Sequence, residues 1–89
     1  MNNKHLDMSL EVFQSLNKEA QLRILFYNRI PLGSKEFDHF STALFYCLGL
    51  FVEVVYHTET LENLSIHGSY EPINLDLYLE QIDESILQI

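Results

Sequence analysis

The side chains in this sequence with chemical potential are four histidines, one cysteine and a glutamate within an apolar run. The histidines are His5, His39, His57 and His67, and the cysteine is Cys47. A zinc site needs ligands that converge at about 2.0–2.3 Å, and it usually shows two ligands at short spacing. No two of these histidines stand two or four residues apart, and Cys47 has no partner cysteine. The sequence therefore predicts no metal site and no cofactor.

Nucleophilic catalysis would require a serine or cysteine beside a base that a third group orients. Cys47 lies inside an apolar segment, where a cysteine more often acts as a small hydrophobic residue. Gly33, Gly49 and Gly68 stand alone, so the chain has no glycine-rich phosphate loop and no Gly-x-Ser-x-Gly motif. We therefore expect a protein that is not an enzyme and has no catalytic residues.

Glu53 is a single charge at the centre of an apolar stretch. One interpretation places it on the solvent side of a sheet, where a charge opposes edge pairing and aggregation. The other interpretation makes it the anchor of a polar contact inside an interface. The sequence favours the solvent-facing position.

The stretch around Glu53, Leu44–Tyr56, is the most apolar in the chain and is interrupted by Gly49. Because glycine supplies the positive φ of a short hairpin, we predict two antiparallel strands joined by a turn at Leu48–Gly49. Pairing across this turn sorts the side chains onto two largely apolar faces. One face carries Ala43, Phe45, Val52, Val54 and Tyr56. The other carries Leu44, Tyr46, Phe51, Glu53 and Val55, and this second face is the predicted interface.

Helices are expected on either side of the hairpin. Ser9 is predicted to cap a short helix through Leu16, and Asn17 to cap a second helix over 18–29. The alternative is one continuous helix from Ser9 to Arg29. The apolar face of the second helix is predicted from residues at helical spacing: Leu22, Leu25, Phe26 and Arg29, widened by Ile24 and Tyr27.

The remaining segments complete the predicted architecture. Leu32–Glu36 is expected to be a loop, and the first strand to run from Phe37 or Asp38 to Cys47. The second strand is predicted over Leu50–His57 and the third over Leu61–His67. Asn74 is expected to cap a last helix from Leu75 to about Ile82, followed by a further helical turn or an extended tail. The prediction is a single α+β domain over 1–89 with N-terminal helices, a three-stranded antiparallel β-meander and a C-terminal helix (ααβββα).

The segments Leu50–Thr60 and Leu77–Asp83 resemble a family of small uncharacterised bacterial proteins, many from Bacteroidetes. Those proteins are similar in an aromatic-Val-Glu-Val-x-Tyr-Asp strand, a Pro-Glu-Thr-Asn loop and a closing Tyr-Leu-Glu-Gln-Ile helix. The resemblance spans roughly residues 30–85. This chain differs at His57 and Thr58, where that pattern has Asp-Pro, and at Leu61, where it has Asn. The resemblance implies the fold and no particular chemistry.

Charge is distributed unevenly along the chain. The first 35 residues hold all five basic residues and three acidic ones, whereas the rest holds ten acidic residues and no lysine or arginine. Nucleic-acid binding and binding to anionic membranes are therefore disfavoured, because both need a basic surface. No apolar core of a secretory signal follows Met1, and one unpaired cysteine agrees with a reducing cytoplasm.

Two function classes follow from these patterns. The first is a cytoplasmic protein-interaction module that forms a homodimer through an apolar sheet face, because so short a chain has little left to cover both faces. The alternative is an acidic inhibitor or nucleic-acid mimic that binds a basic protein partner.

Overall fold

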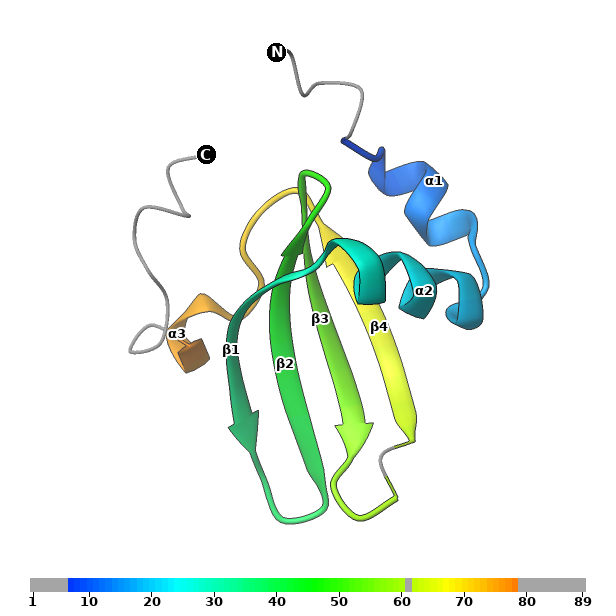
Figure 1. The fold of residues 1–89 in the computed structure, drawn as a ribbon. Helices are drawn as coiled ribbons and strands as arrows, with labels where there is room; N and C mark the ends of the chain where they lie inside the picture. The colour runs from blue at the N-terminus through cyan, green and yellow to red at the C-terminus, as the bar shows by residue number, and fades with distance from the viewer. Residues whose placement is uncertain (1–6, 61, 79–89) are drawn as a thin grey trace.

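A four-stranded antiparallel sheet with three helices makes up the fold, as seen in a computed structural model that describes residues 7–60 and 62–78. The strands follow one another across the sheet in chain order (Figure 1). The elements are α1 (Leu10–Ser15), α2 (Lys18–Asn28), β1 (Ile30–Glu36), β2 (Phe40–Cys47), β3 (Leu50–His57), β4 (Asn63–Ser69) and α3 (Leu75–Tyr78). The predicted α+β class with an antiparallel sheet is confirmed. The prediction of three strands is wrong by one, because β1 was taken for a loop.

β1 escaped prediction because it contains a proline and a glycine. Both residues are tolerated here because β1 is an edge strand, where one side of the backbone needs no partner strand. The pairing with β2 shifts between Pro31 and Gly33, which leaves Leu32 as an extra residue. Leu32 is only 3% exposed and packs with Leu44 and Tyr78. The irregularity in the edge strand therefore adds a side chain to the core.

The turn between β2 and β3 has the predicted geometry. Leu48 and Gly49 both have positive φ, 50° and 88°, as a two-residue type I′ turn requires. Cys47 pairs with Leu50, and the register continues to Phe40 opposite His57. This register gives the two faces that the sequence predicted. β4 begins and ends two residues later than the predicted third strand.

The two N-terminal helices begin at the predicted caps. The Ser9 hydroxyl accepts a hydrogen bond from the Val12 amide, and the Asn17 side chain accepts one from the Ala20 amide. Leu16 between them is extended, so the alternative of one continuous helix is wrong. The Gln21 side chain donates a 2.8 Å hydrogen bond to the Phe13 carbonyl and ties the two helices together.

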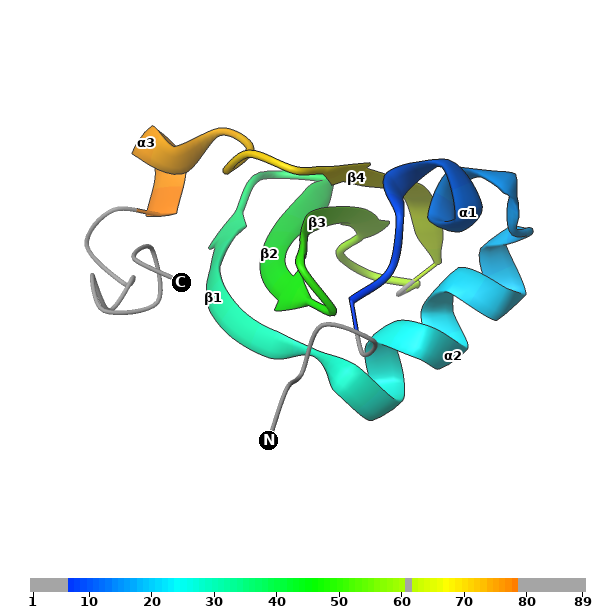
Figure 2. The same ribbon diagram turned by 90° about the horizontal axis from the view of Figure 1, so that it is seen from above.

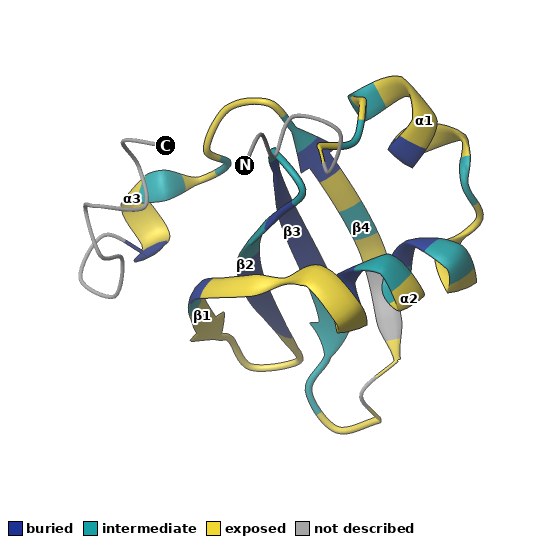
Figure 3. Cartoon of the chain, turned by 45° about the horizontal axis from the view of Figure 1, so that its top comes forward, coloured by how far each residue is buried: buried dark blue, intermediate teal, exposed yellow. Residues whose placement is uncertain are grey.

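Each face of the sheet has its own core, covered from one end of the chain. On one side, which we call the helix face, α1 and α2 bury Phe13 and Leu25 against Val52 and Val54 (Figure 2). The aromatic ring of Phe13 lies so close to β4 that a Cβ at Gly68 would come within 3.1 Å of it. On the other side, which we call the α3 face, the segment Ile73–Tyr78 packs on Leu44 and Phe51. The buried residues accordingly concentrate on β2 and β3 (Figure 3).

The segment before α3 differs from the prediction in one respect. Asn74 does stand directly before the helix, but its side chain donates to Glu53 and its φ is +48°. Within the described residues α3 covers Leu75–Tyr78, and the rest of the predicted helix lies outside them.

We expect Gly49→Ala to lower the free energy of unfolding by about 1–2 kcal/mol, because a residue with a Cβ is strained at this positive φ. The added Cβ would also lie 3.0 Å from the Asp7 carboxyl carbon, which must move. Gly49→Asn should cost less, because asparagine tolerates the left-handed region better than alanine does. Urea unfolding of the three proteins measures the order, and equal stability of both variants with the parent would contradict it.

Candidate functional site

The residues predicted as an interface on the α3 face are mostly covered by the chain itself. Leu44, Phe51 and Glu53 are buried, and only Tyr46 and Val55 are partly exposed. The predicted interface is therefore covered at its centre, because the segment Ile73–Tyr78 reaches back over it.

Glu53 is also not the solvent-facing charge that the sequence favoured. It is 7% exposed, and its carboxylate accepts two 3.1 Å hydrogen bonds from the Asn74 side-chain amide. The Tyr78 hydroxyl lies 2.8 Å from the same carboxylate and 2.6 Å from the Thr42 hydroxyl. A buried carboxylate is tolerated only when it is hydrogen-bonded, and these contacts supply that requirement. Glu53 thus anchors a polar contact, but one within a single chain.

The proton positions in this cluster follow from counting donors. The Tyr78 phenol has one proton, and the Glu53 carboxylate accepts the hydrogen bond from it. The Thr42 hydroxyl then donates its own proton to the Tyr78 oxygen. Burial, and next the neighbouring Glu53, raise the pKa of Tyr78 to about 12, against an opposing effect of Thr42. The cluster therefore holds α3 on the sheet.

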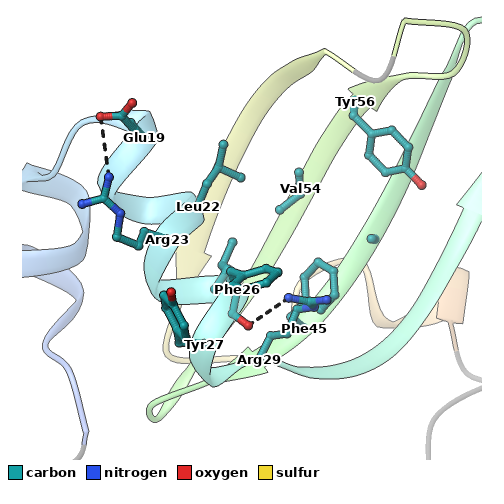
Figure 4. A pocket seen from close by; sticks show the side chains of 11 residues that line it. Glu19, Leu22, Arg23, Phe26, Tyr27, Arg29, Phe45, Val54 and Tyr56 are labelled. Carbon is teal, nitrogen blue, oxygen red and sulfur yellow. Dashed lines mark hydrogen bonds and ion pairs between the residues drawn. The ribbon is translucent and has the colours of Figure 1, made fainter.

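A groove lies on the helix face, between α2 and the strands β2 and β3. It encloses about 610 Å³ and is lined mainly by apolar side chains (Figure 4). The walls used below are Leu22, Leu25 and Phe26 from α2 and Phe45, Val54 and Tyr56 from the sheet. A second hollow, formed by residues of β1, shares Ala43 and Phe45 with it. The open apolar surface therefore continues from α2 towards the edge of the sheet.

Arg29, at the end of α2, joins the two walls of this groove. Its guanidinium carbon lies 5.5 Å from the ring centre of Phe26 and 5.9 Å from that of Phe45, within the range of a cation–π contact. One guanidinium nitrogen also donates a 3.1 Å hydrogen bond to the Phe26 carbonyl (Figure 4). The arrangement fixes a positive charge at an apolar opening.

The aromatic side chains beside the groove are the largest correction to the predicted core. Phe26 and Tyr27 were assigned to the buried face of α2, yet they are 67% and 75% exposed. Of the six predicted positions, Leu25 is the buried one, and Arg29 lies on the groove side as expected. The sequence did contain a signal that some of these side chains are exposed. The predicted apolar positions are spread wider than one side of a helix, which cannot bury all six.

The other candidate residues lie at separate places, except that His67 is opposite Glu53. Cys47 is buried, and burial raises the pKa of its thiol, which keeps the thiol protonated and unreactive near neutral pH. Glu53 pairs across the strands with His67, and Phe40 with His57. Within the described ranges 7–60 and 62–78, no three His, Cys, Asp or Glu residues form a group that could hold a metal.

Comparisons with known proteins add no relative: no family model matches the chain, and no curated protein or solved structure matches it either. The resemblance to a bacterial family therefore stays a prediction. No helix among the described residues is long and apolar enough to span a membrane.

Tyr78 should make a pH-dependent contribution to the stability of the protein, and replacing it by phenylalanine should remove that contribution. The pKa of Tyr78 is raised above the value near 10 of an unfolded tyrosine, so its contribution is complete below pH 10. This contribution to the free energy of unfolding is about 2–3 kcal/mol for a shift of this size, and it is lost as the pH rises through about 12.

Tyr78→Phe should therefore be less stable at pH 8, by about 1–3 kcal/mol, because Glu53 loses a donor. The gap between the two proteins should close between pH 10 and pH 12, because only the parent can lose this proton. Urea unfolding at stepped pH measures the gap. The remaining four tyrosines are common to both proteins and cancel. A gap that stays constant to pH 12 would contradict this contribution of Tyr78.

Proposed function

We propose that the chain is a non-enzymatic, cytoplasmic protein-interaction module that self-associates through the groove and the adjoining outer side of α2. This docking surface replaces the predicted one on the α3 face. The observation that carries the proposal is the exposure of Phe26 and Tyr27 beside an open apolar groove. Exposed aromatic side chains next to an apolar hollow are typical of interfaces, where such residues supply most of the binding energy.

Three further features support a macromolecular occupant. Phe26 and Tyr27 contact each other edge to face, with ring centres 5.1 Å apart, so their positions are already restricted before binding. Pro31, exposed in β1, lines the second hollow together with Phe45 and extends the apolar surface on this face. The groove is open along its length towards β1, which suits a protein surface better than an enclosed small molecule. A reduced thiol at Cys47 is consistent with the cytoplasm.

The double substitution Phe26→Ser and Tyr27→Ser should weaken self-association by at least about tenfold, since aromatic anchors of this kind are commonly worth 1–2 kcal/mol or more. Sedimentation velocity over a series of micromolar concentrations measures the shift from dimer to the 10.5 kDa monomer.

The control removes a second exposed aromatic pair, about half as exposed, at another place. Phe37 and Phe40 stack with ring centres 4.7 Å apart and are 37% and 38% exposed. Phe37→Ser with Phe40→Ser should leave the dimer intact. A parent protein that stays monomeric at high concentration, or a control pair that weakens association as much as the test pair, would refute the proposal.

A second candidate function is the capture of a basic protein segment at the opposite end of the sheet. The connections β1–β2 and β3–β4 lie together at that end (Figure 1). This end of the sheet holds four exposed carboxylates, those of Glu36, Asp38, Glu59 and Glu62. The stacked pair Phe37 and Phe40 lies among them, and aromatic faces with carboxylates suit lysine and arginine side chains.

A peptide rich in lysine and arginine should bind this end, and binding should weaken as salt rises. Asp38→Asn with Glu59→Gln should reduce its affinity by several-fold in calorimetric titration, because each loses a charge near the aromatic pair. Glu11→Gln with Glu71→Gln removes the same charge elsewhere and should have little effect. Absence of binding at low salt, or equal loss in both variants, would exclude this function.

A further inference from the structure

The outer side of α2 carries opposite charges at its two ends and apolar side chains between them. Glu19 lies in the first turn, and Arg29 caps the last. They are ten positions apart in the sequence, which corresponds to about 15 Å along a helix. Phe26 is highly exposed, and Leu22, partly exposed, lines the groove beside it.

Glu19 and Arg29 make only weak or uncharged contacts within their own chain, so each could pair with a charge on another molecule. Glu19 and Arg23 approach to 4.0 Å across one helical turn, with side chains 85% and 68% exposed, which is a weak surface pair. Arg29 contacts the rings of Phe26 and Phe45 and the Phe26 carbonyl, and no carboxylate in the described part of the chain pairs with it. The Arg29 guanidinium is thus held at the groove with no carboxylate paired to it among the described residues.

We propose that the occupant of the groove is the α2 helix of a second copy, packed antiparallel across a two-fold axis, with Glu19 of each copy paired to Arg29 of the other. This inference rests on the proposed self-association and adds its geometry. A two-fold interface brings the same patch of both copies together, so every contact occurs twice. The axis would pass near residue 24.

One register satisfies both the apolar and the charged contacts. Centring the antiparallel pair on residue 24 sets Phe26 opposite Leu22 of the second copy, at the mouth of its groove. The same centring sets Glu19 opposite Arg29, because both pairs are symmetric about residue 24. A parallel arrangement would instead bring like charges together at each end. The order of charges along α2 therefore selects the antiparallel arrangement.

Arg23 is the residue that this arrangement must accommodate, because the two copies of it flank the axis. Each Arg23 has Glu19 of its own chain at 4.0 Å, so a carboxylate accompanies each guanidinium into the interface. Glu19 then lies between Arg23 of its own chain and Arg29 of the second copy. The result is a small network on each side of the axis, alternating in sign.

Charge reversal tests the pairing directly. Glu19→Arg and Arg29→Glu each place two like-charged pairs in the dimer, and each should weaken self-association by about tenfold. An equimolar mixture of the two single variants should associate with nearly the parent affinity, because the heterodimer has opposite charges at both ends. Sedimentation of each variant and of the mixture measures this, with one variant carrying a fluorescent label.

The mixture also controls for folding. Both substitutions place a charge unfavourably against the helix dipole, and the resulting destabilisation of α2 is the same whether a variant is alone or in the mixture. Far-UV circular dichroism at each step verifies that α2 persists. A mixture that associates no better than the single variants overturns the antiparallel pairing.

The outcomes separate this inference from the function on which it rests. If the parent dimerises and the Phe26 and Tyr27 substitutions disrupt it, but neither charge reversal matters, the pairing is wrong and the self-association stands. If the parent is a monomer throughout, both are wrong. If an acidic peptide with apolar residues binds the groove of a monomeric parent, the occupant is another protein.

Discussion

The fold depends on covering both faces of the β2–β3 hairpin. Val52 on one face and Leu44 on the other are each fully buried, and burial of a side chain of this size is worth about 1.5–3 kcal/mol. Residues from the beginning of the chain cover the helix face, and residues from near its end cover the α3 face. The hairpin is thus the shared middle layer of two cores.

The α3 face is held by polar as well as apolar contacts. The part of α3 that the structure describes, Leu75–Tyr78, is too short to be stable in isolation, so tertiary contacts must hold it in place. Tyr78 and Asn74 provide them by satisfying Glu53, which would otherwise be an uncompensated buried charge. The same contacts fix the direction of the segment, because an apolar contact alone would allow it to slide. Burying these polar groups costs desolvation free energy, but their hydrogen bonds define one position of the segment on the sheet.

The helix face is covered less completely than the α3 face. α1 and α2 bury Phe13 and Leu25, but the surface of Phe45 and Tyr56 remains part of an open groove. Arg29 spans the opening with its charge, while Phe26 and Tyr27 point outward beside it. Arg23 and Arg29 thus line this groove, although the whole chain carries a net charge of −8.

The sequence by itself determined the local features: the caps at Ser9 and Asn17, the turn at Leu48–Gly49, the full length of β3 and the assignment of residues to two faces. Each depends on neighbours within a few residues, or on the alternation of a strand. Only the tertiary structure decided that Pro31 and Gly33 belong to a strand, because an edge position removes the usual penalty. It likewise decided that Phe26 is exposed and that Glu53 is buried. The hydrogen-bond donors that allow burial of Glu53 belong to Asn74 and Tyr78, which lie more than twenty residues away in the sequence. The choice of which face each end of the chain covers was long-range, and local pattern carries no information about it.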